Sequence, residues 1–252
     1  MRSFKLLAIF LVITLFIGGC TSKEVINFNP EDLSMQLETD HFQFYCIEKD
    51  KKCLKDLSEL LEGSLERVTT DLGVELDYKP KILIYPDITS FQNAIAQLNA
   101  PSIAVGTMWD KDIKMVSPLY PIKGYSRDDI KKVILHEFVH ILHSNITKVT
   151  KESQYWLWEG VAYYEAGQLD LRYKLLIKKQ KLLSIPELRI DFYNIAYGYT
   201  YAASAVDFIV NQYGYDKLQE LILYPDDFEK VLNISLEEFQ KQWLEYIKFH
   251  YV

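Results

Sequence analysis

The first half of the chain combines short apolar runs with one long amphipathic segment. Four runs carry apolar side chains on alternate or consecutive positions and are bounded by proline, glycine or polar residues, which is typical of strands. These predicted strands cover residues 41–46, 81–85, 103–107 and 113–116. In segment 54–72 the apolar residues recur every three or four positions, and Gly73 follows, which predicts a helix that ends there. Residues 90–98 predict a shorter helix.

After Gly124 the pattern becomes helical. Ser126 stands where a helix N-cap is expected, and the two aspartates that follow it favour the positive end of the helix dipole. Predicted helices cover residues 126–143, 154–166, 202–213 and 235–249. Because strands come first and helices follow, the pattern indicates an α+β fold. We expect a small mixed sheet with helices in residues 37–124 and a mainly helical lobe in residues 125–252.

The first twenty residues have the pattern of an export signal. Two basic residues precede an apolar run of about 12 residues, which is too short to span a hydrocarbon core of ~30 Å comfortably. The segment Ile17-Gly18-Gly19-Cys20 then resembles the lipobox of bacterial lipoproteins, whose cysteine is lipidated and becomes the N-terminus. We expect a signal peptide in 1–19, a lipidated tether in 20–36 and a folded domain in 37–252. An uncleaved signal anchor is the alternative.

This interpretation places the domain on the outer face of a bacterial cytoplasmic membrane, held to the bilayer through Cys20.

Hydrophobic residues make up 49% of the 252 residues and charged residues 25%, which is the balance of a chain that can bury a core. The formal net charge is −7 and no basic stripe stands out, so nucleic acid is not an expected partner. Cys46 and Cys53 could form a disulfide in that compartment or remain reduced thiols, and the sequence leaves both states open.

The strongest candidate for chemistry is His136-Glu137-Phe138-Val139-His140, within a predicted helix. Residues four apart on a helix differ by about 40° around its axis and ~6 Å along it, so one zinc ion can touch both imidazoles. Glu137 lies about 100° from His136, where it can reach a water on the metal without ligating the metal. A core helix with two hydrogen-bonded histidines is the alternative. Catalytic zinc needs a third protein ligand and an open fourth position.

Glu159 is the candidate third ligand. It follows His140 with 18 residues between them, enough for a turn and a second, antiparallel helix to return a carboxylate to the first. An exposed helix carboxylate is the alternative, but apolar residues flank Glu159 on both sides. His143 lies about 10 Å from His136 along the helix, too far to share one ion, and is expected near the site or at the surface. Glu165 lies off the ligand face and could support a ligand, cap or pair.

HExxH followed by 18 residues and Glu, within Trp156-Leu157-Trp158-Glu159-Gly160-Val161-Ala162-Tyr163-Tyr164-Glu165, resembles the gluzincin metallopeptidases. The resemblance is to their peptidase MA-like and aminopeptidase-type members. It implies a thermolysin-like catalytic fold and one zinc ion per chain, held by His136, His140 and Glu159. It also implies hydrolysis of a peptide or protein substrate with Glu137 as the general base. The alternative function is a catalytically inactive, zinc-stabilised lipoprotein that binds a peptide or protein partner.

The same resemblance implies a tyrosine that donates to the developing oxyanion, just before a helix. Tyr201 is the best match, with Tyr199 and Tyr197 close behind, and a tyrosine-rich loop that only packs is the alternative. Aminopeptidases of this clan also carry a Gly-x-Met-Glu-Asn segment whose glutamate holds the substrate's free amine. The similar segment here, Gly106-Thr107-Met108-Trp109-Asp110, has Trp109 in that place. We therefore expect an endopeptidase or a specialised peptidase rather than an aminopeptidase.

Overall fold

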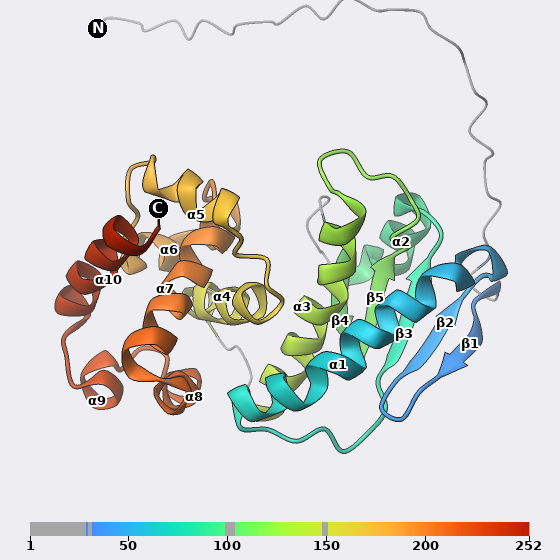
Figure 1. Cartoon of the computed structure of the whole chain (residues 1–252), viewed down its shortest axis with the longest axis horizontal. Coiled ribbons are helices and arrows are strands. Elements are labelled where there is room, and N and C mark those ends of the chain that lie inside the picture. Colours follow the sequence, from blue (N-terminus) through green and yellow to red (C-terminus); the bar gives the residue numbers. More distant parts are fainter. Residues whose placement is uncertain (1–28, 30–31, 99–103, 148–150, 252) are drawn as a thin grey trace, which may run out of the picture.

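The structure is a computed structural model of the chain and describes residue 29 and residues 32–98, 104–147 and 151–251. Two halves lie side by side, a sheet with its covering helices and a body made of helices alone (Figure 1). Among the described helices, none is long and apolar enough to cross a bilayer. Cys20 and the predicted signal peptide lie outside the described residues.

The sheet is small and mixed, as predicted. Its strands are β1 (Ser34–Glu38), β2 (Gln43–Cys46), β3 (Lys81–Tyr85), β4 (Gly106–Trp109) and β5 (Asp112–Val116), in the order β1-β2-β3-β5-β4. The central strands β2, β3 and β5 run parallel, and the two edge strands pair antiparallel to their neighbours. Strand β1 was not predicted and starts within the expected tether, while β4 begins three residues later than expected.

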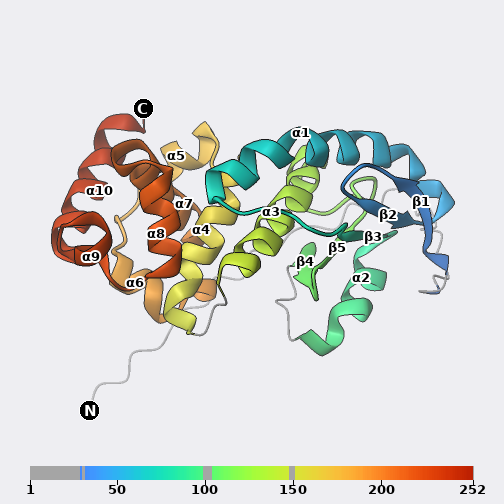
Figure 2. The ribbon, with the colours of Figure 1, turned by 90° about the horizontal axis from the view of Figure 1, so that it is seen from below.

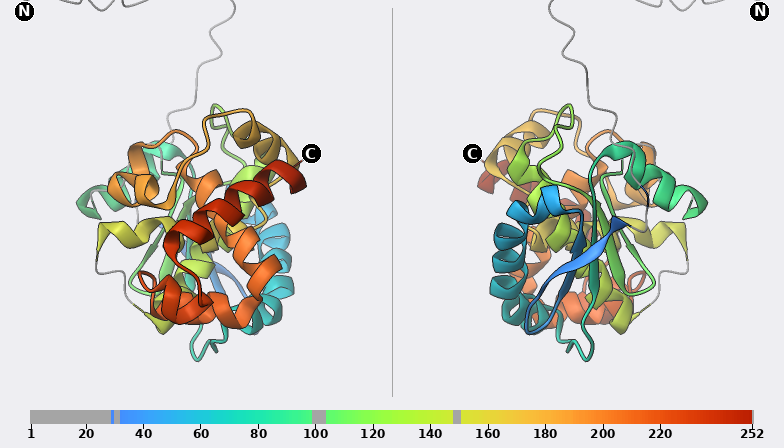
Figure 3. Two further views of the ribbon diagram at one scale, coloured as in Figure 1. Left: turned by 90° about the vertical axis from the view of Figure 1, so that its left-hand side faces the viewer. Right: turned by 90° about the vertical axis from the view of Figure 1, so that its right-hand side faces the viewer.

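Two helices cover opposite faces of this sheet (Figures 2 and 3). Helix α1 (Leu54–Leu72) follows the 3-10 helix η2 (Glu48–Cys53) and ends at Gly73, which has a left-handed φ of 64°, as predicted. Helix α2 (Ile88–Ile95) continues into the 3-10 helix η3 (Ala96–Leu98). Cys46 and Cys53 are free, buried thiols, so the structure has the second of the two predicted states. Burial raises the pKa of these thiols to about 12 and about 11, respectively.

Helix α3 (Arg127–Ile146) begins at the predicted N-cap. Ser126 accepts from the backbone N–H of Asp129, whose side chain in turn accepts from the backbone of Ser126, a capping box. The middle of α3 is buried all round, because α1, β4 and β5 cover part of it and α4 (Tyr155–Glu165) covers the rest. The sequence assigns α3 to the helical lobe, but in space it lies at the junction of the two halves (Figure 1).

The helical half is built around the contact between α4 and α7 (Gly198–Tyr213). A Cβ at Gly160 of α4 would lie 2.8 Å from the carbonyl carbon of Ala202, so only glycine permits this approach. Around this pair lie α5 (Leu171–Lys178), α6 (Ile185–Ile190), η5 (Phe192–Asn194), α8 (Tyr215–Leu223), α9 (Phe228–Leu232) and α10 (Leu236–His250), preceded by η4 (Glu152–Gln154). The short helices α5, α6, α8 and α9 were not predicted, and α7 starts four residues earlier than expected.

Candidate metal centre

Three buried side chains converge where α3 meets α4. His136 and His140 lie one turn apart on α3, and their Nε2 atoms are 3.1 Å from each other. Oε2 of Glu159, from α4, lies 3.2 Å from Nε2 of His136 and 3.3 Å from Nε2 of His140. Within the described residues, these three are the one group of histidines, cysteines and carboxylates placed to hold a metal ion.

The spacing of these atoms fits a tetrahedral ion. Ligand atoms bound at zinc distances of about 2.0–2.1 Å in a tetrahedron stand about 3.3–3.4 Å apart. The three observed edges, 3.1 to 3.3 Å, come close to that triangle. A carboxylate oxygen and two imidazole lone pairs aimed at one point would repel one another without a cation between them. The residues therefore fit a metal with three protein ligands.

The electrostatics of Glu159 agree with this. Burial acts to raise its pKa. When no metal is bound and the imidazoles are protonated, the charge on His140 and the hydrogen bonds with both rings outweigh burial and hold the pKa of Glu159 well below its usual range. Glu159 is thus a carboxylate at any ordinary pH. Its other oxygen, Oε1, accepts a hydrogen bond of 3.0 Å from the hydroxyl of Tyr193.

Glu137 is buried beside this triangle, on the side that faces the edge strand β4. Burial is the largest influence on its carboxyl group and raises its pKa, although the nearby imidazoles and the backbone N–H of Met108 act in the opposite direction. A Cβ at Gly106 would lie 3.3 Å from Oε1 of Glu137, and 2.3 Å from Cγ1 of Val133. The absence of a side chain at Gly106 therefore lets β4 run directly past the carboxylate.

Tyr201, the predicted oxyanion donor, does not face the metal centre. Its ring is buried, and its hydroxyl donates to the backbone carbonyl of Lys181 at 2.9 Å, with that of Ile177 at 3.4 Å. The reason is the start of α7 at Gly198, which places Tyr201 inside the helix instead of before it. Residues two apart on a helix point about 200° from each other, so Tyr199 and Tyr201 face opposite sides. The prediction for Tyr201 is corrected accordingly.

Tyr193 and Tyr199 lie near the centre, as does Tyr163, whose ring lies 6.5 Å from that of His136. Tyr193 belongs to η5 and touches Glu159 directly, while the ring of Tyr199 lies 6.4 Å from that of Tyr193 and 6.1 Å from that of Tyr163. Burial and the charge of Glu159 raise the pKa of both phenols far above neutral, so both remain protonated donors. Tyr197 is exposed and has a φ of 63°. Tyr193 was not predicted from the sequence, because a three-residue 3-10 helix has no periodic signal.

His143 is buried but provides no ligand atom to the group of three. Its ring stacks on Trp158 at 4.3 Å, and the ring of His140 stacks on the same indole at 5.0 Å. Burial and the neighbouring His140 lower the pKa of His143 to about 3, so this imidazole stays neutral. It supports the packing around His140 and does not belong to the ligand set.

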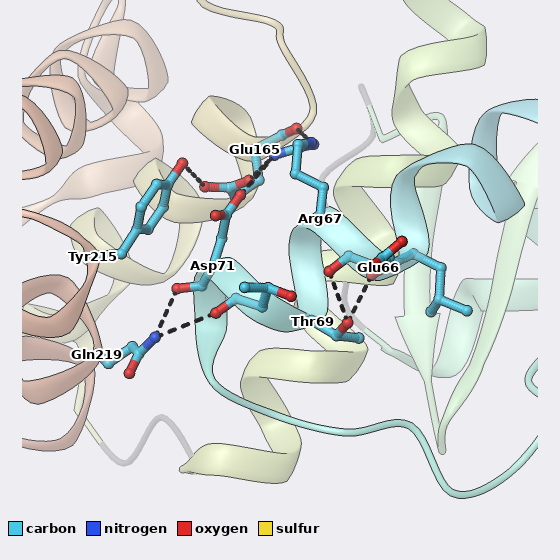
Figure 4. A network of polar contacts seen from close by, with 9 residues as sticks. Glu66, Arg67, Thr69, Asp71, Glu165, Tyr215 and Gln219 are labelled. Atoms are coloured by element: carbon cyan, nitrogen blue, oxygen red, sulfur yellow. Dashed lines mark hydrogen bonds and ion pairs between the residues drawn. The ribbon is translucent and has the colours of Figure 1, made fainter.

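Glu165 pairs across the two halves instead of supporting a ligand (Figure 4). Its carboxylate is fully buried and forms an ion pair with Arg67 of α1, which also donates to the backbone carbonyl of Glu165 at 2.9 Å. The hydroxyl of Tyr215 in α8 donates to the same carboxylate at 3.2 Å. Close by, Gln219 of α8 donates to the backbone carbonyl of Asp71 at 3.0 Å. The contacts with Arg67 fix α4, and with it Glu159, relative to the sheet half, and the contact of Gln219 joins α8 to the same helix α1.

Comparison with known proteins gives one clear relationship. No curated protein matches the chain in sequence. The sequence profile of the Peptidase MA superfamily matches residues 61–248, from within α1 to the last turns of α10, and so includes every residue of the metal centre. With this match over most of its length, and with two histidines and a glutamate arranged around one point, the chain belongs to the Peptidase MA superfamily of metallopeptidase-like proteins.

Proposed function

We propose that this protein is a zinc-dependent peptidase that cleaves peptide bonds outside the cytoplasmic membrane, to which a lipid on Cys20 tethers it. The observation that carries the catalytic part is the position of Glu137. Its buried carboxylate interacts electrostatically with all three ligands but is not one of the group that could hold the ion, and it lies on the side of the edge strand β4. A site that only binds metal for stability has no need of an acid at that place.

A zinc ion held by His136, His140 and Glu159 would act as a Lewis acid on a water molecule and on the scissile carbonyl. The carboxylate of Glu137 takes a proton from the attacking water and delivers it to the nitrogen of the leaving amine. Burial, by raising the pKa of this carboxyl group, makes it a better proton acceptor than an exposed glutamate. The hydroxyl of Tyr193 donates to the carbonyl oxygen as negative charge develops there.

The edge strand β4 supports a peptide as substrate. It pairs with β5 on one side and is the last strand of the sheet in the described residues. An extended peptide can add to such an edge through main-chain hydrogen bonds, which would bring its backbone past Glu137. Trp109 ends β4 with 46% of its surface exposed, where aminopeptidases of the clan have a glutamate for the free amine. We propose cleavage within chains and not at a free N-terminus.

The test measures zinc content and peptide cleavage of the unaltered full chain and of the variant Glu137→Gln, both in detergent. We expect one zinc per chain in both proteins and cleavage by the unaltered protein alone, for peptides with blocked as well as free N-termini. Glu66→Gln, an exposed glutamate on α1, is the matched control and should keep full activity. Full activity in Glu137→Gln would overturn the mechanism. If all three proteins contained zinc and none cleaved a peptide, the alternative would be favoured, a catalytically inactive lipoprotein that binds a peptide or protein partner.

The tether rests on the sequence pattern before Cys20. In a bacterial host, the unaltered protein should fractionate with membranes and carry lipid on its N-terminal cysteine, detected by mass spectrometry. Cys20→Ala should remove the lipid. An unmodified cysteine in the unaltered protein would contradict this part alone and leave the peptidase proposal standing.

A further inference from the structure

Gln168 makes a contact that the proposed mechanism does not use. Its side-chain oxygen, Oε1, lies 2.8 Å from Nδ1 of His136, on the side of the ring opposite the metal centre. Nε2 of the same ring is the atom that faces Glu159 and His140. An imidazole can bind a metal through Nε2 only if that nitrogen carries no proton. The neighbour of Nδ1 therefore decides whether His136 is a ligand.

The amide oxygen of Gln168 can only accept, so the nitrogen that faces it must carry the proton. This places the proton of neutral His136 on Nδ1 and leaves a lone pair on Nε2. With the amide turned over, its NH₂ group would face Nδ1 and drive the proton onto Nε2, where a metal could not bind. We infer that Gln168 is a positioning residue, which fixes the metal-binding tautomer and the ring orientation of His136.

The two histidines are supported in different ways. Nδ1 of His140 is buried without a hydrogen-bond partner in the described part of the chain, and its ring is held by stacking on Trp158. A stacked indole fixes the plane of a ring but not the position of its proton. Of the two histidines in the metal centre, Gln168 therefore acts on the one whose Nδ1 has a hydrogen-bond partner.

The backbone after α4 is shaped to deliver this amide. Gly167 has a left-handed φ of 63°, its N–H donates to Tyr164 O at 3.0 Å, and the N–H of Gln168 donates to Tyr163 O at 3.1 Å. This pair of bonds is the Schellman ending of a helix, which reverses the chain at a glycine. Lys132 of α3, one turn before His136, donates to the carbonyl of Gly167 at 2.7 Å. The turn that carries Gln168 is thus fastened to the helix that carries His136.

The hydrogen-bond partner of Nδ1 in His136 is the neutral amide of Gln168. A carboxylate is a common partner of metal-bound histidine in other proteins. A carboxylate would make the imidazole more basic and hold the metal more tightly. An amide sets the same tautomer with less charge donated to the metal, which leaves the metal a stronger Lewis acid. This inference rests on the metal site of the proposed function and adds a residue to it.

The experiment measures zinc dissociation constants of the full chain by competition with a chelator. Gln168→Met removes the acceptor and should weaken zinc binding by roughly 10- to 100-fold. Gln168→Glu restores an acceptor and should bind zinc at least as tightly as the unaltered protein. Gln180→Met, at an exposed glutamine, is the matched control and should change nothing. Unchanged affinity in Gln168→Met, or equal loss in Gln168→Glu, would overturn the inference.

A second measurement does not need the metal. The ring ¹⁵N chemical shifts of His136 in the metal-free protein, measured at a pH high enough for the ring to be neutral, should report the single proton on Nδ1, and a mixture of tautomers in Gln168→Met. A neutral ring whose single proton is on Nε2 in the unaltered protein would contradict the role of Gln168, even if Gln168→Met did not fold. If the unaltered protein bound no zinc but had the Nδ1 proton, the proposed function would fail while the role of Gln168 in setting the tautomer would stand.

Discussion

The hydroxyl of Tyr193 donates to Oε1 of Glu159 at 3.0 Å, while Oε2 of the same carboxylate faces the two imidazoles. One carboxylate thus joins the metal centre to a tyrosine on a different element, the 3-10 helix η5. Tyr193 is 44% exposed, so its hydroxyl can turn from Glu159 to a bound substrate. This combination of a buried partner and an open approach distinguishes Tyr193 from the other tyrosines nearby.

Replacing Tyr193 with phenylalanine should reduce kcat by roughly 10²–10³, the loss that follows removal of one oxyanion donor. Zinc content should be retained, because the three ligand atoms remain. The measurement is steady-state cleavage of the best peptide found for the unaltered protein.

Tyr201→Phe is the matched control, since its hydroxyl donates to backbone carbonyls away from the site. It should keep its kcat and lose about 1 kcal/mol of stability, the usual cost of one buried hydrogen bond. The assignment fails if Tyr201→Phe loses activity and Tyr193→Phe does not.

Tyr193 and Tyr201 show which part of the site could not be predicted from the sequence. The spacing of His136 and His140 is a property of one helix, and Glu159 needed only a second helix packed against it, so all three could be predicted. The start of α7 could not be predicted to within one turn, and a shift of two residues reverses the face of a helix. Tyr193 is placed by a short connection between helices, and no local pattern announces it.

The fold divides in the same way. The glycine after α1 and the N-cap serine before α3 are local signals, and the structure has both where the sequence predicts them. The strand order, which puts β4 at an edge beside Glu137, depends on contacts between distant segments. The helices of five to nine residues in the second half are too short for a clear period, and tertiary packing defines them.

Gly160 allows the close packing of α4 on α7 and directly follows the metal ligand Glu159. A Cβ there would come within 2.8 Å of the backbone of Ala202, so Gly160→Ala must push α4 away from α7. We expect the free energy of unfolding to fall by about 1–3 kcal/mol, as for other overpacked cores. Weaker zinc binding should accompany it, because Glu159 precedes this glycine. Urea unfolding of the metal-free protein and chelator competition measure the two effects.

The matched control is Gly63→Ala in α1, where an added Cβ meets nothing within 4 Å. It should stabilise the protein by roughly 0.5–1 kcal/mol, since alanine favours a helix interior. If Gly160→Ala were as well tolerated as Gly63→Ala, the close approach of α4 and α7 would be disproved.

The ion pair between Arg67 and Glu165 predicts a pH-dependent loss of stability. Burial raises the pKa of Glu165 above its usual value of 4.5, even with Arg67 beside it. A raised folded-state pKa means that the folded protein binds this proton more tightly, so the contribution of Glu165 to stability falls as pH rises. Arg67→Met removes the compensating charge and raises the folded pKa further. The variant should therefore lose more stability at pH 7 than at pH 5.

The side chain of Arg67 is 47% exposed. We therefore expect Arg67→Met to lose about 1–3 kcal/mol of stability at pH 7, less than the loss from breaking a fully buried pair. Adding Glu165→Gln to Arg67→Met should remove the pH dependence. Lys55→Met breaks an exposed pair with Glu59 and should cost no more than about 0.5 kcal/mol at either pH. A loss in Arg67→Met that is equal at pH 5 and pH 7 would contradict the buried charge as its cause.

Metal binding should itself stabilise the fold, because the ligands come from two helices that unfolding separates. At free zinc 100-fold above the dissociation constant, linkage adds about 2.7 kcal/mol to the free energy of unfolding. Thermal unfolding should therefore shift upward with zinc and return with a chelator. In Glu159→Gln the shift should be lost or much reduced, because a neutral amide replaces the one charged ligand, whereas Glu66→Gln should keep it. An equal shift in Glu159→Gln and the unaltered protein would place the ion elsewhere than between α3 and α4.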